Sequence, residues 1–391
     1  MAVTEKGSIQ ENEGPRRVKV LFLTSLFDSL GGSEKNIVEL VRNLPKELFQ
    51  AYVFALKGGF LLREIKKLGI HGEEVGLNSI LGLKGMLKGF KWFRFLRKEK
   101  IDVLVTFHED ADLWGGLIGR LARVPVILSS KRDMGYQVTR KQRMAYRFLN
   151  GSFHRFVAVS HAVKREIGRT QQIPESKFEV IYSGIAMNGN AGVEKTNYLH
   201  DSIGVPRSHR LVGMVASFRP VKGQEFFVRA AARVLDRRRD VEFVIVGYKE
   251  TDYFEKVSKM IQDLGIDDKV HCIGHRQDVP EILKSLDVFV LSSLHEGFSN
   301  ALLEAMAAGL PVIAPDSGGN PEIVSPETGI LFKPGDVKML AKAILRLLEN
   351  EKEWREMGLR GRERVRRKFS LQGMLQKYER LFLSEIEKVG S

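Results

Sequence analysis

The sequence has one cysteine, Cys272, in 391 residues. A single thiol excludes an intramolecular disulfide framework and fits a reducing compartment. The first 16 residues are polar and charged, without the apolar core of an export signal, and we expect them to form a disordered tail. No apolar stretch approaches the roughly 18 residues that cross a bilayer. We therefore expect a soluble, cytoplasmic protein, attached at most to the inner surface of the cell membrane.

Acidic residues are too few to balance the basic ones, and the formal net charge is +14. Residues 1–190 contain 31 Lys and Arg against 19 Asp and Glu, a net +12, whereas the remainder contains 31 against 29. This asymmetry indicates that the first half faces an anionic partner, such as phospholipid, a phosphorylated glycan or nucleic acid. The basic runs contain no recognisable DNA- or RNA-binding module, so we expect no nucleic acid.

Short β-branched runs alternate with longer amphipathic stretches in the first half of the chain. The expected strands are 18–24, 51–55, 70–75, 103–107, 124–128, 156–159 and 178–181, and the first expected helix is 35–44. Nearly continuous apolar strands that alternate with helices are typical of a parallel sheet covered on both faces.

The pattern restarts after a polar stretch rich in Asn and Gly, at about 186–206. New strands are expected at 211–216, 241–246, 270–273, 288–291 and 311–314, and helices at 337–350, 352–369 and 371–388. We therefore predict an α/β fold of two Rossmann-like, doubly wound domains, residues 17–190 and 191–370. A final helix, within 371–391, packs back on the first domain. The cleft between the domains is the expected site, because such sheets bind ligands at the carboxyl ends of their strands.

The segment from Glu296 to Glu304 has the richest chemistry. A strand ends at about 291, a polar loop follows, and a helix begins near Ser299 or Asn300. The unpaired amides and the dipole at that helix start form a phosphate site. Glu304 lies one turn into the helix, where its carboxylate can reach hydroxyl groups of the same ligand. Helix capping does not explain Glu304, because the capping-box position after Ser299 is Leu302.

The run EGFSNALLEAMAAGLPVIA resembles the Glu-x7-Glu signature of retaining glycosyltransferases of family four, group one, which have the GT-B fold. The similarity extends over about 17–383, in the same order. The resemblance implies an acceptor-side first domain and a second domain that binds a nucleotide-sugar. It implies that Glu296 contacts the donor sugar and Glu304 the ribose. It also implies that the intervening segment meets the sugar and the diphosphate: Gly297, Phe298, Ser299 and Asn300.

Two further motifs lie at the expected donor site. The loop Gly31-Gly32-Ser33-Glu34 resembles the GG-x-E loop of the family, in which glycines let the backbone approach a ligand. An ordinary turn with Ser33 as the helix cap explains the same residues. In the segment SFRPVKG, Lys222 matches the lysine that neutralises the departing diphosphate. The usual arginine position, near 216–217, holds no cation, and we expect Arg219 to substitute for it.

On the acceptor side, His108 follows the strand 103–107 and matches a family histidine that faces the donor sugar and the acceptor. A histidine that only packs or binds water is the alternative. Where the family has His-Asp after the fifth strand, this chain has Lys131-Arg132-Asp133. We expect Lys131 and Arg132 to bind an acceptor phosphate.

The remaining resemblances concern loops. His275-Arg276 resembles the loop that touches the nucleobase, and the loop 318–322 (GGNPE) resembles one near the donor. Ser183-Gly184 resembles the hinge between the domains.

A metal is not expected. Asp110-Ala111-Asp112 matches Asp-x-Asp, the metal signature of another glycosyltransferase fold, but it precedes a helix, where acidic residues favour the positive dipole end. No His or Cys cluster has metal-ligand spacing. We therefore predict neither a metal ion nor another cofactor.

The stretch 83–100 (LKGMLKGFKWFRFLRKEK) is basic and amphipathic. Its apolar stripe consists of Leu83, Met86, Leu87, Phe90 and Phe93, with lysines largely opposite. We expect the stripe to cover the sheet, as in an ordinary helix. The alternative is a helix that lies on anionic lipid.

The combined motifs predict transfer of a hexose, from a UDP-hexose, to a hydroxyl acceptor with retention at the anomeric carbon. The basic first half favours a lipid-linked or cell-envelope glycan as the acceptor. No carboxylate is placed as a covalent nucleophile, so same-face attack is expected. Two alternatives remain: a GT-B-fold sugar-nucleotide epimerase or phosphorylase, and a basic nucleic-acid-binding protein.

Overall fold

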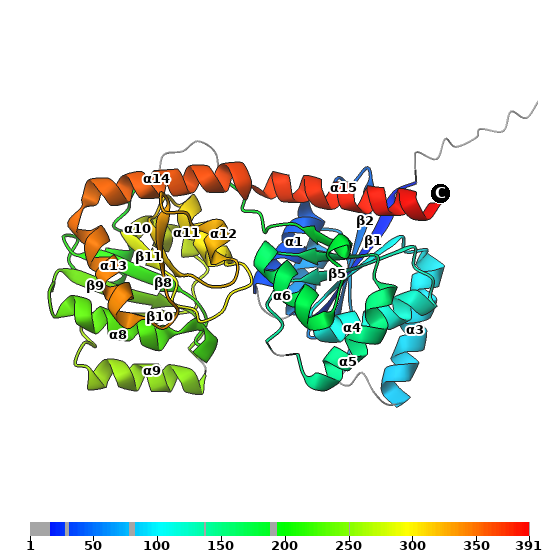
Figure 1. Cartoon of the computed structure of the whole chain (residues 1–391), viewed down its shortest axis with the longest axis horizontal. Coiled ribbons are helices and arrows are strands. Elements are labelled where there is room, and N and C mark those ends of the chain that lie inside the picture. The colour runs from blue at the N-terminus through cyan, green and yellow to red at the C-terminus, as the bar shows by residue number, and fades with distance from the viewer. Residues whose placement is uncertain are drawn as a thin grey trace, which may run out of the picture.

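The computed structural model describes residues 16–27, 31–77, 83–136, 138–187, 194–249 and 251–390. Two parallel sheets lie side by side, one in each half of the chain, with helices on both faces of each (Figure 1). This arrangement confirms the predicted fold class. The predicted tail, residues 1–16, and the predicted boundary at 190/191 lie almost wholly outside the described residues.

The first sheet has the strand order β3-β2-β1-β4-β5-β6-β7. Its strands are β1 (Val18–Leu26), β2 (Phe49–Lys57), β3 (His71–Glu74), β4 (Val103–Phe107), β5 (Val126–Lys131), β6 (Arg155–Ala158) and β7 (Phe178–Val180). From β1, successive strands are added toward one edge of the sheet up to β3, and from β4 onward they are added toward the other edge, so the strand order reverses between β1 and β4. A sheet of this type opens a crevice at that point, outside the carboxyl ends of the two strands.

Helices cover the two faces of this sheet in two sets. On one face lie α1 (Gly32–Asn43), α2 (Phe60–Lys67) and α15 (Leu371–Gly390). On the other lie α3 (Leu83–Glu99), α4 (Glu109–Leu121), α5 (Arg140–Leu149) and α6 (His161–Gln171). Short 3-10 turns at Asn150–Ser152 and Glu175–Lys177 precede β6 and β7.

The second sheet has the order β10-β9-β8-β11-β12-β13, with its own reversal between β8 and β11. Its strands are β8 (Arg210–Val215), β9 (Val241–Val246), β10 (Val270–Gly274), β11 (Val288–Val290), β12 (Val312–Pro315) and β13 (Gly329–Phe332). Its helices are α7 (Tyr198–Ile203), α8 (Gln224–Leu235), α9 (Asp252–Asp263), α10 (Val279–Ser285), α11 (Asn300–Ala307), α12 (Asn320–Ile323), α13 (Val337–Glu349) and α14 (Glu351–Lys368), with a 3-10 turn at Pro220–Lys222. The sequence analysis missed β13, because four residues are too short for a clear period.

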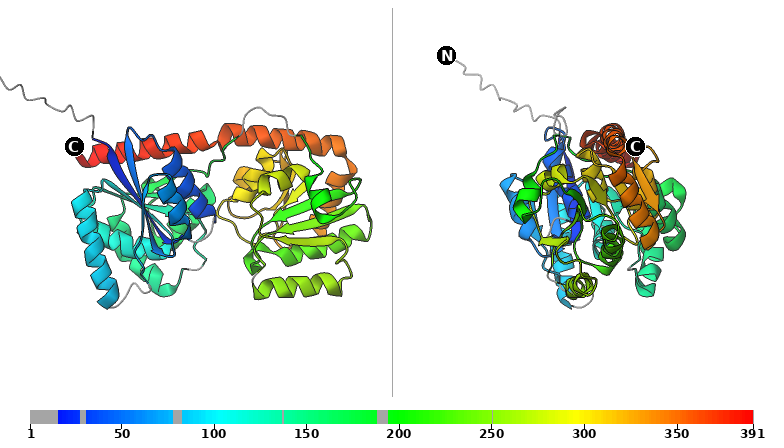
Figure 2. Two further views of the ribbon diagram at one scale, coloured as in Figure 1. Left: turned by 180° about the vertical axis from the view of Figure 1, so that it is seen from behind. Right: turned by 90° about the vertical axis from the view of Figure 1, so that its left-hand side faces the viewer.

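The C-terminal helix α15 leaves the second half of the molecule and runs along the first sheet (Figures 1 and 2). Tyr378 and Phe382 of α15 are fully buried in the same core cluster as Phe22 of β1. The chain crosses between the halves twice, and the crossings touch: Ile185 bridges to Ser370. A Cβ on Gly184 would lie 2.6 Å from the Cα of Leu371, so this crossing needs glycine.

The orientation of the helix α3 differs from the one that we expected. Three residues of the apolar stripe that we expected to cover the sheet point outward instead: Met86, Leu87 and Phe90 are 72 %, 63 % and 62 % exposed. Phe93, the last residue of the stripe, is partly buried and packs against the core as expected. The buried face contains Trp92 and Leu96, with two glycines one and two turns earlier. The side chain of Leu83, also in the predicted stripe, is outside the described residues. None of the helices in the described residues is long and apolar enough to cross a membrane.

The extent of the strand β5 also differs from the one that we expected. It begins after Pro125 and continues to Lys131, whereas we expected it to end at 128. Ser129 and Ser130 lie beyond the predicted end of the strand, but both pair within the sheet and are buried. Lys131 therefore lies in a strand rather than in a loop.

Candidate active site

The loop after β11 leads into α11, as the sequence predicts. Ser299 is the N-cap of α11, and its side chain accepts a hydrogen bond from the amide of Leu302. The first amides of a helix have no partner within the helix, so the start of α11 presents free donors and the positive end of its dipole. Glu304 lies one turn inside. The helix start and its cap thus lie where the sequence predicts them, and phosphate binding there stays a prediction.

Glu296 lies in this loop beside Lys222. The Lys222 Nζ is 2.7 Å from Glu296 Oε1, and the Ser293 hydroxyl donates to the same oxygen over 2.8 Å. The Glu296 side chain is only 11 % exposed. Lys222 ends the 3-10 turn that follows β8, so the pair joins the two strands at the reversal point of the second sheet. Arg219, at the start of that turn, is exposed.

Glycines set how closely the surrounding loops approach. A Cβ on Gly297 would lie 2.2 Å from the backbone oxygen of Arg132, in the first half of the chain. A Cβ on Gly318 would lie 1.7 Å from the backbone oxygen of Glu296, and Gly318 has a φ of +55°. Any larger residue would force these backbones apart, so the loop 296–297 is held between the two halves of the molecule.

The start of α1 faces the start of α11 across the two halves. Lys35 of α1 forms an ion pair with Glu304 of α11. A Cβ on Gly32 would lie 3.6 Å from Asn300 Nδ2, and Asn300 Oδ1 is buried without a partner among the described residues. Gly32 thus brings the backbone of the first half close to the predicted donor site.

His108 occupies the reversal point of the first sheet, directly after β4. Its Nδ1 is 3.3 Å from the Thr24 hydroxyl of β1, and its Nε2 is 3.9 Å from Glu34 Oε1. The backbone φ of His108 is +69°, a conformation that costs energy in a non-glycine residue. That conformation turns the imidazole toward the GG-x-E loop.

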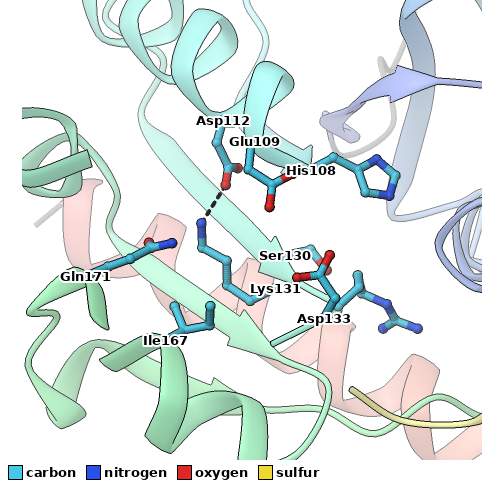
Figure 3. Close-up of a pocket in the computed structure, with 9 residues that line it drawn as sticks. His108, Glu109, Asp112, Ser130, Lys131, Asp133, Ile167 and Gln171 are labelled. Carbon is cyan, nitrogen blue, oxygen red and sulfur yellow. Dashed lines mark hydrogen bonds and ion pairs between the residues drawn. The ribbon is translucent and has the colours of Figure 1, made fainter. Parts of the chain in front are cut away.

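A pocket lies behind His108, at the carboxyl edge of β5 (Figure 3). Asp112 and Glu109 of α4 and Lys131 of β5 point toward one another there, whereas His108 points away from them. Burial, and then the neighbouring carboxylate of Asp133, raise the pKa of Glu109 above its ordinary value. The pocket therefore combines one buried ion pair with a carboxyl group that protonates more readily than usual.

Lys131 has a different environment from the one expected. Its side chain is 7 % exposed, and its Nζ lies 2.6 Å from the buried carboxylate of Asp112 and 4.3 Å from the ring centre of Tyr146. Asp112 also accepts from Ser129 over 2.8 Å. The sequence analysis attributed Asp112 to the helix dipole and Lys131 to an acceptor phosphate. The structure pairs their charges with each other because β5 extends further than expected.

We expect Lys131→Ala to lower the free energy of unfolding by about 3–5 kcal/mol, because it leaves the Asp112 carboxylate buried without its cation. Urea denaturation at neutral pH measures this loss. The exposed variant Arg143→Ala is the control and should change the value by less than about 0.5 kcal/mol. A stable Lys131→Ala protein with a much higher KM for acceptor would instead favour the original assignment to an acceptor phosphate.

Arg132 is partly buried between the two halves. One guanidinium nitrogen, Nη2, donates to the Ser183 hydroxyl over 2.6 Å, and Nη1 is buried without a hydrogen-bond partner among the described residues. Burial lowers the pKa of Arg132, while Tyr378 and Glu34 nearby oppose that shift. The hydroxyl of Tyr378 also interacts with this side chain, so the guanidinium is partly satisfied within the protein, and binding of an acceptor phosphate by Arg132 stays a prediction.

At the other end of the predicted site, His275 stacks on Tyr248, with ring centres 4.1 Å apart and planes within 7°. Arg276 is committed to Asp278 and Tyr198, with Nη2 2.5 Å from Asp278 Oδ2 and 3.0 Å from the Tyr198 hydroxyl. The pair of stacked rings suits a planar base, whereas the charge of Arg276 is already compensated.

Glu322 joins the two halves by capping a helix that belongs to the other half. Its carboxylate accepts the backbone amides of His161 and Ala162, at the start of α6, over 2.9 and 2.8 Å. It also accepts the Tyr182 hydroxyl over 2.9 Å. Ser160, the N-cap of α6, donates to the backbone oxygen of Gly297 over 2.8 Å. The start of α6 is thus fixed to both donor-side loops of the second half.

We expect Glu322→Ala to destabilise the arrangement in which the two halves are in contact by about 2 kcal/mol, since it removes charge-assisted hydrogen bonds. The ratio of molecules with the halves in contact to molecules with the halves apart should fall roughly 30-fold. Small-angle X-ray scattering should show a larger radius of gyration. Glu327→Ala, on an exposed residue of the following loop, is the control. Identical scattering curves for the wild type and Glu322→Ala would show that this carboxylate does not hold the two halves together.

Four residues at the site were not among the predicted site residues: Glu34, Lys35, Ser293 and Tyr248. Glu34 belongs to the predicted GG-x-E loop, but the sequence does not show that it lies beside His108. Lys35 meets Glu304 from 269 positions away, and Tyr248 meets His275 from the preceding strand's loop. Local patterns contain no signal for such contacts, because only the tertiary fold brings these residues together.

Comparisons with known proteins agree with this geometry. The family model "Glycosyl transferases group 1" matches residues 197–364, and "Glycosyltransferase Family 4" matches residues 30–188. The chain is 26 % identical over 340 residues to the UDP-Gal:alpha-D-GlcNAc-diphosphoundecaprenol alpha-1,3-galactosyltransferase of Escherichia coli, covering 83 % of this chain and 87 % of that one. It is 30 % identical over 228 residues to the N-acetyl-alpha-D-glucosaminyl L-malate synthase of Bacillus anthracis, which is 58 % of each chain.

The fold also matches solved structures. HepE of Anabaena, solved in complex with UDP, superposes with a TM-score of 0.82 at 22 % identity, over 94 % of this chain and 100 % of that one. At this identity the likeness shows the fold alone. The two family models together span both halves, in the order of the two sheets. The chain therefore belongs to the group 1 glycosyltransferases of family 4, which have the GT-B fold.

Proposed function

We propose that this protein moves a hexosyl unit from a nucleotide-sugar, a UDP-sugar, to a hydroxyl group with retention at the anomeric carbon and without a metal ion. The observation that carries this proposal is the Lys222–Glu296 pair beside the start of α11. It combines a cation and free helix amides for a diphosphate with a carboxylate for sugar hydroxyls. The E. coli relative acts, by its name, on UDP-Gal.

Each group then has a proposed role. The amides of Phe298, Ser299 and Asn300 and the ammonium of Lys222 stabilise the charge that develops on the leaving diphosphate. Arg219 is the second, exposed cation.

On the sugar side, Glu296 orients the hexose by accepting hydrogen bonds from its hydroxyls. Glu304 holds the ribose, and His275 stacks with the nucleobase. His108 faces the sugar and the acceptor from the opposite side of the cleft.

The reaction itself is proposed to be a same-face substitution. The bond from the anomeric carbon to the diphosphate oxygen breaks as the acceptor oxygen forms its new bond on the same face. The acceptor's proton passes to the departing phosphate oxygen. The groups placed here favour this route, because they all stabilise the diphosphate and none is a carboxylate assigned to attack the anomeric carbon.

The acceptor is proposed to be a lipid-linked or cell-envelope glycan at the cytoplasmic face of the cell membrane. The net +12 charge of residues 1–190 suits an anionic acceptor or surface. The buried, partly unpartnered guanidinium of Arg132 supplies a donor on that side of the cleft. The E. coli relative is named for a diphosphoundecaprenol acceptor, which is consistent with this class.

A thermal-shift series with UDP, GDP, ADP and their hexose conjugates tests the donor. We expect UDP and one UDP-hexose to raise Tm, and the effect should persist in excess chelator. Transfer to a lipid diphosphate glycan should then give a product of unchanged anomeric configuration by NMR. Loss of activity in chelator with recovery in Mg²⁺ or Mn²⁺ would contradict the metal-independent proposal. Turnover with phosphate and no acceptor would favour a phosphorylase, and conversion of the nucleotide-sugar to its isomer an epimerase.

A further inference from the structure

The helix α3 packs on α4 through Gly89 and through Trp92, which stacks on Trp114 with ring centres 4.8 Å apart, and it turns three other large apolar side chains outward. Gly85 and Gly89 are buried, and a Cβ on Gly89 would lie only 3.1 Å from Ile118 of α4. Met86, Leu87 and Phe90 are at least 62 % exposed on the opposite side. Ordinary surface helices bury such side chains, so their exposure needs an explanation other than the core.

The same surface continues over α4 and α5. The helix α4 packs against both α3 and α5, and all three lie on one face of the first sheet, opposite to α15 (Figure 1). Leu117 and Leu121 of α4 are 47 % and 63 % exposed, and Met144 and Phe148 of α5 are 61 % and 81 % exposed. We name these residues the α3–α5 patch: Met86, Leu87, Phe90, Leu117, Leu121, Met144 and Phe148.

The patch lies among basic side chains. Exposed residues of α3 and α5 supply Lys91, Arg94, Arg97, Lys98, Arg140, Arg143 and Arg147. The sequence of α5 contains no acidic residue, and the single acidic residue of α3, Glu99, faces Lys19 and Tyr52 of the sheet. Of these cations, Lys91 pairs with Glu73 of β3 over 3.5 Å, and the others have no ion pair among the described residues. Apolar side chains surrounded by a net excess of cations are typical of surfaces that enter the boundary between acidic headgroups and acyl chains.

We propose that the α3–α5 patch docks the protein on a bilayer that contains anionic phospholipid. A second copy of the chain is a poorer occupant, since it would bring an equally positive surface against the patch. Nucleic acid would satisfy the cations but leave the outward leucine, methionine and phenylalanine side chains without apolar contacts. An anionic bilayer offers negative headgroups to the cations and acyl chains to the apolar side chains.

Docking at this face would place the pocket beside His108 one length of α4 away from the membrane surface. The helix α4 starts at Glu109, in the wall of the pocket beside His108, and ends at Leu121, within the patch. A lipid-linked acceptor in the docked bilayer would thus have its polar end one helix length from that pocket. This proposal deepens the proposed acceptor class, but the binding itself does not depend on sugar transfer.

Vesicle sedimentation tests the proposal with the full chain. We expect binding to vesicles of phosphatidylglycerol and phosphatidylcholine, little binding to phosphatidylcholine alone, and weaker binding at 1 M salt, where charge is screened within about 3 Å. The triple variant Met86→Ser, Phe90→Ser, Phe148→Ser should lower the partition coefficient by about tenfold or more. So should Arg94→Glu, Arg143→Glu, Arg147→Glu. Each variant should keep the wild-type Tm and the Tm shift with UDP.

The controls change the same number of exposed apolar or basic residues in the second half: Leu264→Ser, Met339→Ser, Leu359→Ser, and Arg233→Glu, Arg237→Glu, Arg239→Glu. These should bind vesicles like the wild type. The proposal is overturned if the wild type does not sediment with anionic vesicles, or if control and patch variants lose binding equally. A patch variant that changes only the oligomeric state would also overturn it and identify a second copy as the occupant. If donor binding fails while vesicle binding persists, the proposed sugar transfer falls and the docking surface stands.

Discussion

Lys222→Ala is expected to lower kcat by about 100- to 1000-fold, the size of effect that follows the loss of one preorganised group that stabilises developing negative charge. In the structure the Lys222 ammonium is 2.7 Å from Glu296 and 30 % exposed, so it is held near the start of α11 but open to a ligand. Its contribution should be greatest when the bond to the diphosphate breaks. KM for the donor should therefore change much less than kcat.

Arg219→Ala is the matched control for this change. Both cations flank the same 3-10 turn, but Arg219 is exposed and the structure, over the residues it describes, gives its side chain no hydrogen bond or ion pair. Solvent and salt screen such a charge, and we expect a fall in kcat of about tenfold or less. Equal losses for both variants would mean that Arg219 moves to the diphosphate on binding. Near-wild-type kinetics for Lys222→Ala would refute the proposed donor site.

Glu304→Ala is expected to weaken the binding of UDP by about 10- to 100-fold, because charge-assisted hydrogen bonds to ribose hydroxyls contribute about 1.5–3 kcal/mol. The change should appear in Kd by isothermal titration calorimetry and in KM. Turnover at saturating donor should fall by only a few-fold, since Glu304 lies a helical turn away from the proposed reacting bond.

Lys35→Ala separates two readings of that result. Glu304 pairs with Lys35 across the two halves, so its loss removes an interdomain contact as well as the proposed ribose ligand. Lys35→Ala removes the contact but keeps the carboxylate. We expect Lys35→Ala to leave UDP affinity unchanged or to raise it. In this variant the Glu304 carboxylate does not have to give up its ion pair with Lys35 in order to bind the ribose. A loss of affinity as large as that of Glu304→Ala would assign the effect to the interdomain pair.

The donor half of the site follows closely from local sequence. The strand end, the Ser299 cap, and the position of Glu304 one turn into α11 all depend on residues within about ten positions of one another. Their geometry is set by hydrogen bonds inside one strand-loop-helix unit. A strand-loop-helix unit has few alternative conformations, and so the sequence pattern predicts the phosphate-binding start of α11 before any long-range contact is known.

The acceptor half depended on tertiary contacts. Ser129, Ser130 and Lys131 lie beyond the predicted end of the strand at 128, yet pairing with β4 and β6 buries them. The charge of Lys131 is compensated by Asp112, on a helix 19 residues away. A local pattern cannot show that a buried charge is paired, since the partner comes from another element.

In the helix α3, the sequence predicted the helix but not which of its faces is buried. Its period correctly predicts a helix, and its largest apolar residues form one stripe. Most of the stripe faces outward because the first turns of α3 place Gly89 against Ile118 of α4, where a Cβ would lie only 3.1 Å away, while Trp92 and Leu96 fill the rest of the buried face. The contour of the neighbouring helix thus decided which side of α3 is buried.

The sequence by itself determined the two α/β halves, the strand-loop-helix unit at the start of α11, and the positions of Glu296 in that loop and Glu304 in the helix, because strand and helix periods and helix ends are local properties. Only the tertiary structure decided how the halves meet: Glu322 capping α6, Lys35 facing Glu304, and Gly297 against Arg132. These contacts join residues more than 130 positions apart, and their geometry depends on the docking of two separately folded sheets rather than on any local preference.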